Sequence, residues 1–465
     1  MTDKIASLSL SRLYHSLFLQ VDGSSLALFR IAFGALLIWE VARYWTSGAI
    51  SGMYVDPQFH FTYMGFGWIT AWPGQGMYFH FFGLMGLAFL IMIGLWYRVS
   101  AFLFFLGFTY LFLIDKAYYL NHFYLISLLS LLLIFVPSHN SFSLDALRRG
   151  TGQNGAVPAW ALWLLRFQLG IVYFYAGIAK LHWDWLTADP IRVWMAERTD
   201  VPIISAFYND DWFLFLFSYG GLFLDLFAVP LLFWSRSRPY VFAVLVLFHI
   251  TNAEVFSIGI FPWLMIAATL LFFSPDWPRR LAGWLTRFGR RKGVSGLPAQ
   301  GQRSRLQPPP ETKRTALRYV GLAALAIFVT MQVLVPLRHF IYPGDANWTE
   351  EGSRFAWRMM LRAKTGETRI TVMDPVTHTT SEIESLVVLT TYQARVMSRF
   401  PNMVLQWSHH VADDLRGQGY PQIQVRAYVP VSLNGRPPQL LVDPQVDLAA
   451  EKFSLWQPDW VLPLQ

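Results

Sequence analysis

The stretch W-A-L-W-L-L-R-F-Q-L-G-I-V-Y-F-Y-A-G-I-A-K, residues 160–180, is apolar over most of its length and ends on Lys180. A helix of roughly 20 apolar residues crosses the hydrocarbon core of a bilayer, so this stretch predicts a transmembrane helix. A lysine at the edge of hydrocarbon is costly to keep charged. It therefore reaches to water, pairs with another group or takes part in chemistry. The stretch indicates a membrane protein with a candidate functional lysine.

Eight other apolar runs indicate that the chain crosses the membrane many times. The composition agrees, because 54% of residues are hydrophobic and 14% are charged, whereas soluble domains carry about 25% charged residues. The run at 239–252 is short, so we expect about nine transmembrane helices. We predict the spans at 26–44, 77–96, 99–115, 121–137, 160–180, 212–234, 239–252, 255–274 and 316–337.

The segments outside the spans predict three further features. In residues 1–25, apolar side chains at near-helical spacing predict an amphipathic helix on the membrane surface. Residues 276–315 are rich in Gly, Pro, Gln and Arg and predict a flexible basic linker within the transmembrane bundle of residues 26–337. Residues 338–465 are more polar and predict an extramembrane α+β domain.

Alternating patterns and turn residues define the expected structure of residues 338–465. Runs at 369–372 and 423–429 alternate as strands do. Asn434-Gly435, followed by an apolar run at 440–442, predicts a hairpin turn with its return strand. Residues 381–415 predict helix, broken at Pro401. The fold class is therefore a mainly α membrane protein with a C-terminal α+β domain.

The distribution of charge predicts the orientation in the membrane. Basic residues crowd the link between the eighth and ninth spans, whereas the long first loop, residues 45–76, has no lysine or arginine. By the positive-inside rule, the N-terminus is cytoplasmic and residues 338–465 lie outside, in the periplasm or the lumen. The net charge of +8 is then explained by a membrane face, and we expect no nucleic-acid partner.

Polar residues from three separate spans are predicted to meet at the outer membrane edge. Asn121 and His122 begin the fourth span, Lys180 ends the fifth, and His249 and Asn252 end the seventh. Snorkelling or interfacial side chains remain the alternative interpretation. Burial disfavours an ammonium ion, so Lys180 is a candidate base for a weakly acidic hydroxyl such as that of a hydroquinone. His122 is a candidate proton shuttle or hydrogen-bond donor.

Other polar residues carry weaker predictions. The spans contain no His-x-x-x-His spacing and the chain has no cysteine, so no metal site is predicted. Asp225 lies within the sixth span, where an acid needs a partner. We expect it to pair with Arg166, in a structural rather than a catalytic role.

At these positions the chain resembles vitamin K-dependent gamma-glutamyl carboxylase and the horizontally transferred transmembrane (HTTM) proteins related to it. The resemblance runs in order over about residues 25–463. The matching stretches are L-F-R-I-A-F-G at 28–34, Asp115-Lys116 through Asn121-His122, V-Y-F at 172–174 through Lys180-Leu181, G-L-F-L-D-L at 221–226, Phe248-His249 through Gly259, S-P-D-W-P-R at 274–279, Asn347-Trp348-Thr349, Trp357 with Met359-Met360, and D-P-Q-V-D at 443–447.

The resemblance implies a reaction. Lys180 would deprotonate reduced vitamin K (phylloquinol or menaquinol), and O2 would then oxidise the quinol to its epoxide. The strong base formed on that path would remove a γ-hydrogen from a glutamate side chain, and CO2 would trap the carbanion, assisted by His122. The residues implied to enclose the quinone are His249, Asn252, Phe256, Ser257, Met359 and Met360. We further expect Asn121, Trp357 and Arg198 to contact the glutamate of a peptide or protein substrate.

Departures from the family pattern keep two alternatives open. The animal enzyme has a lysine where this chain has Ala179, a histidine where it has Arg362, and a long C-terminal region beyond the point where this sequence ends. The natural substrate is therefore not predicted. One alternative is a quinol epoxidase or oxidase without carboxylation. The other is a non-enzymatic membrane transport or binding module.

Overall fold

Seven helices in the described part of the chain are long and apolar enough to cross a membrane. The computed structural model describes residues 16–150, 155–256, 258–289 and 315–465. With two shorter apolar helices, the prediction of about nine spans is confirmed. The long helices are α2 (Ser24–Thr46), α3 (Gly76–Ile93), α4 (Tyr97–Ile114), α7 (Ala159–Ala179), α11 (Asp211–Phe233), α12 (Arg238–Phe256) and α15 (Thr315–Leu334), which continues into a 3-10 turn at Val335–Phe340. The shorter two are α5 (Asn121–Phe135) and α13 (Phe261–Thr269), extended by a 3-10 turn at Leu270–Phe272.

The predicted boundary between the seventh and eighth spans is wrong. Helix α12 continues to Phe256, and the next helix begins only at Phe261. Between them Gly259 has a φ of 61°, a left-handed conformation that glycine adopts without steric cost. His249 and Asn252 therefore lie inside α12 rather than at its end. After the turn, α13 begins at Phe261.

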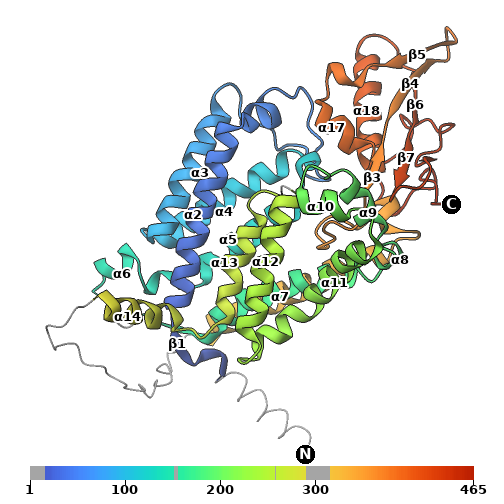
Figure 1. The fold of residues 1–465 in the computed structure, drawn as a ribbon. Coiled ribbons are helices and arrows are strands. Elements are labelled where there is room, and N and C mark those ends of the chain that lie inside the picture. Colours follow the sequence, from blue (N-terminus) through green and yellow to red (C-terminus); the bar gives the residue numbers. More distant parts are fainter. Residues whose placement is uncertain (1–15, 151–154, 257, 290–314) are drawn as a thin grey trace, which may run out of the picture.

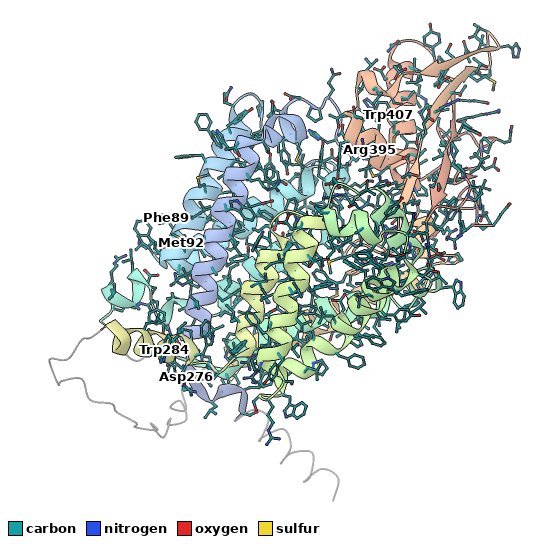
Figure 2. All side chains as sticks on the ribbon, in the orientation of Figure 1. Phe89, Met92, Asp276, Trp284, Arg395 and Trp407 are labelled. Atoms are coloured by element: carbon teal, nitrogen blue, oxygen red, sulfur yellow. The ribbon has the colours of Figure 1, made fainter. Side chains whose placement is uncertain are left out.

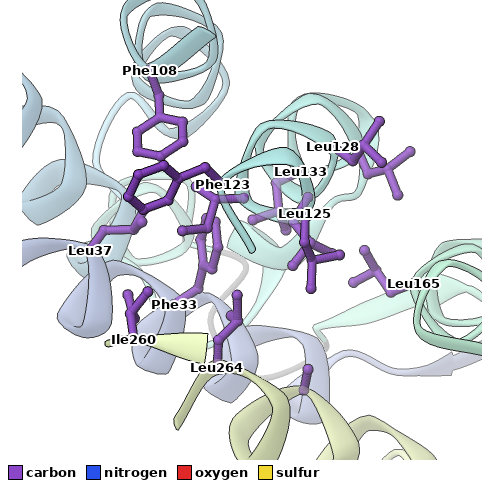
Figure 3. Packing of buried hydrophobic residues seen from close by; sticks show 14 of the residues in the cluster. Phe33, Leu37, Phe108, Phe123, Leu125, Leu128, Leu133, Leu165, Ile260 and Leu264 are labelled. Atoms are coloured by element: carbon purple, nitrogen blue, oxygen red, sulfur yellow. The ribbon is translucent and has the colours of Figure 1, made fainter. Parts of the chain in front are cut away.

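The interior of the bundle is packed with aliphatic and aromatic side chains from several helices. Phe33 and Leu37 of α2 pack with Phe108 of α4 and Phe123 of α5, and all four are buried (Figure 3). Arg30, also in α2, is fully buried and donates to the carbonyl groups of Ile91 and Met92, at 2.7 and 2.5 Å. These bonds satisfy a charge that the apolar interior alone would not tolerate.

The C-terminal domain is a small α+β unit at one end of the bundle (Figure 1). One antiparallel sheet has the order β5 (Thr379–Ile383), β4 (Arg369–Asp374), β6 (Gln424–Tyr428), and the second has the order β3 (Lys364–Gly366), β7 (Pro430–Leu433), β8 (Gln439–Leu440). The predicted strands and hairpin are confirmed, but the predicted helix over 381–415 is wrong at its start, where the chain forms β5. Its other elements are α16 (Ala346–Thr349), a 3-10 turn (Ser385–Val387), α17 (Thr391–Met397) and α18 (Pro401–Gly417).

Shorter elements connect the spans. They are β1 (Gln20–Asp22) paired with β2 (Ala156–Pro158), a π-helical turn (Ser51–Val55), 3-10 turns (Lys116–Tyr118 and Ser138–Asn140), α6 (Leu144–Arg148), α8 (Trp183–Leu186), α9 (Asp189–Ala196), α10 (Pro202–Phe207) and α14 (Trp277–Gly289). The prediction that the linker of residues 276–315 is flexible is wrong at its start, where the chain forms α14. Residues 290–314 lie outside the described part. The predicted amphipathic helix of residues 1–25 falls mostly on residues 1–15, also outside that part, and its end forms β1.

The C-terminal domain is fixed to the bundle by polar contacts with α8, the short helix that follows α7. The Asp184 carboxylate accepts hydrogen bonds from Arg436 at 2.7 Å and from the Asn434 amide at 2.6 Å. Burial alone would raise the pKa of Asp184, but these donors outweigh it and hold that pKa below its usual value. Trp407 in this domain and Trp284 on α14 mark opposite ends of the molecule (Figure 2). The domain is therefore held over one end of the bundle.

Candidate functional site

Lys180 caps the C-terminus of α7 and is buried together with a carboxylate. Its Nζ lies 2.6 Å from Asp225 Oδ2 on α11, and the two side chains are 8% exposed. The predicted pairing of Asp225 with Arg166 is therefore wrong. Arg166 lies fourteen residues earlier, about 21 Å along the helix, and donates instead to the carbonyl groups of Leu271 and Phe273 at 2.8 and 3.0 Å.

The Lys180–Asp225 pair lines a small and mostly apolar cavity of about 90 Å³, here called the inner chamber. Lys180 Nζ lies 5.1 Å from the centre of the Trp185 ring, which forms part of the wall. His249 Nε2 is 3.0 Å from the Tyr173 hydroxyl, and its Nδ1 has no partner among the described residues. The wall also includes Val172, Ala176, Ile191, Trp194, Phe217, Gly221, Phe248, Asn252, Phe256, Ile258, Phe261, Met265, Met359 and Met360.

A larger, polar cavity of about 330 Å³ adjoins the inner chamber and is called the outer chamber. Ile258, Phe261, Met359 and Met360 line both cavities, so these four side chains form the partition between them. His122 and Asn121, at the start of α5, line the outer chamber on the bundle side. The cations that line it are Lys116, Arg354, Arg358, Arg362, Lys364 and Arg399.

The outer chamber holds more positive charge than its own acid can balance. Glu350 is the carboxylate in its lining; it is hydrogen-bonded to Arg362, and its Oε1 lies 3.7 Å from Lys364 Nζ. Burial and, secondarily, the charge of Arg354 lower the pKa of Lys116 to about 7. Burial likewise lowers the pKa of Lys364 to about 7, although Glu350 opposes the shift. Such a cavity is suited to bind an anionic group, above all a carboxylate.

Strained backbone directs several of these cations into one cavity. Phe355, Trp357 and Met360 all have positive φ, at 61°, 57° and 48°, in a stretch without glycine. Such conformations are costly for ordinary residues and are concentrated at functional sites. The stretch winds irregularly between Arg354 and Arg362, and both arginines line the outer chamber.

The predicted site residues are divided between the two chambers. Lys180, His249, Asn252 and Phe256 line the inner chamber, Asn121 and His122 line the outer one, and Met359 and Met360 line both. Ser257 lies outside the described residues. Snorkelling, the alternative interpretation of Lys180, does not fit a side chain that is 8% exposed and paired with Asp225.

Two predicted substrate contacts line neither chamber. Arg198 pairs with Asp200 at 2.9 Å and donates to the Glu254 carbonyl at 3.1 Å. Trp357 is fully buried and stacks on Tyr124, with ring centres 4.9 Å apart. Sequence reasoning also assigned no role to Lys116, Arg354, Arg358 and Lys364. Arg354, Arg358 and Arg362 are each four apart, but the chain is not helical there, so this spacing does not explain their shared direction.

Fold and site together define a polytopic membrane protein with a buried amine–carboxylate pair beneath an extramembrane domain. Residues 18–277 match the HTTM domain model, and the chain belongs to that family. Residues 317–465 match the lumenal domain of vitamin K-dependent gamma-carboxylase. No solved structure matches the chain. The two matches cover the bundle and the C-terminal domain respectively, and they support a carboxylase-like enzyme.

Proposed function

We propose that the protein oxidises a reduced naphthoquinone of the vitamin K type in the inner chamber and couples that oxidation to carboxylation of a glutamate side chain in the outer chamber. The observation that carries the proposal is the pair of adjoining cavities. One is apolar and contains a buried amine, the other is lined by cations, and four side chains line both of them. Quinol oxidation by O2 supplies the base strength that a lysine lacks.

Lys180 is proposed to accept the proton of the quinol hydroxyl. In a medium of low dielectric constant, a buried Lys–Asp pair avoids the burial of two charges when the proton resides on the carboxyl group. Asp225 Oδ2, 2.6 Å from Lys180 Nζ, is thus positioned to keep the amine neutral and to fix the orientation of the Lys180 side chain. His249, fixed by Tyr173, faces the same cavity and is positioned to bind a quinone oxygen.

The outer chamber is proposed to bind the glutamate side chain and its product. Carboxylation replaces one C–H bond by a C–C bond to CO2 and releases one proton, so a side chain of charge −1 becomes one of charge −2. Arg354, Arg358 and Lys116 supply positive charge that favours this change. His122, buried and packed against Phe261 of the partition with ring centres 6.0 Å apart, is positioned to donate to the developing charge.

A paired assay on the purified full-length protein tests the proposal. It supplies reduced vitamin K, O2, labelled CO2 and a short glutamate peptide, and it follows epoxide and fixed label together. Both products should form, and both should be lost in Lys180→Ala. Epoxide without fixed label would indicate a quinol oxidase, and the absence of both from folded protein would contradict the proposed chemistry.

His122→Ala is expected to reduce carboxylation by about 100-fold or more while reducing epoxidation much less. The reason is that His122 lines the outer chamber, whereas the proposed base lines the inner one. The ratio of fixed label to epoxide in the paired assay measures this difference. His409→Ala, on α18, is the matched control and should leave the ratio unchanged. Equal loss of both products would place the action of His122 on the quinol.

The proposed orientation puts the N-terminus in the cytoplasm and the C-terminal domain in the lumen or periplasm. The outer chamber would then receive its peptide from outside, while the quinol enters from the lipid. A tag after Gln465 should be labelled by a membrane-impermeant reagent in intact cells or vesicles, and a tag inserted near Gly296 should not. Reversed labelling would contradict this orientation.

A further inference from the structure

A pocket of about 760 Å³ lies at the end of the bundle opposite the C-terminal domain. It is formed where α3 passes into α4 and where α5 passes through a 3-10 turn into α6, the end of the molecule at which α6 and α14 lie (Figure 1). None of its lining residues lines the inner or the outer chamber. The pocket is thus separate from the proposed reaction site.

Positive charge lines this pocket and is only partly neutralised. Arg98, Arg148 and Arg149 are all exposed, and all three line it. Asp145 also lines it, but its two carboxylate oxygens accept the backbone N–H groups of Trp96 and Tyr97 at 3.1 and 3.0 Å. Within the described part of the chain, the guanidinium groups of Arg98 and Arg148 form no hydrogen bond or ion pair. The pocket therefore has free donors of the fork geometry that suits phosphate.

A buried histidine gives independent evidence of a ligand site. His139 lines the pocket, is 7% exposed and stacks on Tyr97, with ring centres 4.9 Å apart. Its Nδ1 is buried and has no hydrogen-bond partner among the described residues. Burial, together with the charges of Arg149 and Arg98, lowers the pKa of His139 to about 4. At neutral pH the ring is therefore uncharged, and it carries a buried polar atom without a hydrogen-bond partner, which is rare in proteins and is typical of a site beside a polar ligand.

The rim of the pocket has the composition of a membrane–water interface. Trp96 is 61% exposed and Leu147 is 70% exposed, beside the arginines. Helix α14 is held next to this rim, because the Arg279 guanidinium lies 5.3 Å from the centre of the Phe142 ring and donates to Ser141 Oγ at 3.1 Å. Leu281, Trp284 and Leu285 of α14 are also exposed. Exposed tryptophan and leucine beside arginine are typical of segments at the headgroup level of a bilayer.

We propose that this pocket binds a phosphate group at the membrane surface, supplied by the headgroup of an anionic phospholipid. Arg98 and Arg148 bind the phosphate oxygens, His139 contributes a further hydrogen bond, and Trp96 and Leu147 contact the acyl region. A lipid bound there would fix the ends of α4 and α6 relative to each other. The site is independent of the proposed carboxylation chemistry.

The test titrates the purified full-length protein with phosphatidylglycerol, phosphatidylcholine or inorganic phosphate and measures bound ligand by native mass spectrometry. Phosphatidylglycerol should bind more tightly than phosphatidylcholine. In the double variant Arg98→Gln/Arg148→Gln, its affinity should fall by about 25-fold, because each arginine near a membrane surface contributes roughly fivefold. Arg236→Gln, an exposed arginine outside the pocket, is the matched control and should bind as the unmodified protein does.

The possible outcomes are distinct. Inorganic phosphate that binds as tightly as the lipid, with the same dependence on the two arginines, would keep the phosphate site but assign it a soluble ligand. Equal binding of both lipids, or equal affinity in the double variant and the control, would overturn the proposal. Misfolding is excluded by comparing the thermal unfolding of the variants in phosphatidylcholine alone, where all should agree because the substituted side chains are exposed.

Discussion

Lys180→Ala is expected to reduce quinol epoxidation by about 100-fold to 10,000-fold, the range that a positioned general base contributes. Lys180 is the proposed base of the inner chamber, where it lies beside a carboxylate, whereas His249 there is already hydrogen-bonded to Tyr173. Carboxylation should fall in parallel, because it depends on the base produced by quinol oxidation. The paired assay of epoxide and fixed label measures both effects, and equilibrium binding of the quinone should persist.

A second variant separates chemistry from folding. Lys180→Ala alone leaves Asp225 buried without its partner, which destabilises the bundle. Lys180→Ala/Asp225→Asn removes both ionisable groups, so it should unfold closer to the temperature of the unmodified protein and yet remain inactive. Lys452→Ala, at an exposed position of the C-terminal domain, is the matched control and should retain full activity. Full epoxidation in Lys180→Ala would exclude the lysine as the base.

The spans and the need of Lys180 for a partner were predictable because both depend on local properties of the chain. Length and hydrophobicity identify a membrane helix, and a lysine within one demands an explanation. The partner of Asp225 was not predictable in the same way. It depends on how α7 and α11 pack against each other, and a single sequence does not specify that. Arg166 within α7 and Lys180 at its end both carry a cationic side chain, and charge alone does not indicate which of them pairs with Asp225.

The outer chamber was missed because its backbone is irregular. Arg354, Arg358 and Arg362 have a spacing of four, which in a helix would place them on one face. The chain is not helical there, and the positive φ of Phe355, Trp357 and Met360 produces the shared direction by another route. Helix α14 was missed for a related reason, since its apolar positions 277, 281, 284 and 285 stand beside a segment rich in Gly, Pro and Gln. Local composition obscured the helical period.

Glu350→Gln is expected to lower the free energy of unfolding of the protein by about 3–5 kcal/mol, which is the usual effect of removing one partner from a buried ion pair. The Glu350 carboxylate is 2% exposed and neutralises Arg362, whose Nε donates to it at 2.5 Å, and Lys364 at 3.7 Å. The measurement is the unfolding temperature of the purified protein. Glu367→Gln, in an exposed pair with Arg369, is the matched control and should cause no measurable loss.

Arg362 and Lys364, the two cations left without a partner by Glu350→Gln, should contribute unequally to the loss of stability. Lys364 can release its proton, because burial already lowers its pKa to about 7 and removal of Glu350 lowers that pKa further. Arg362 remains charged at any physiological pH. Glu350→Gln/Arg362→Met should therefore recover more stability than Glu350→Gln/Lys364→Met. Equal recovery would show that Lys364 is held fully charged, and no loss in Glu350→Gln would show that solvent screens the whole cluster.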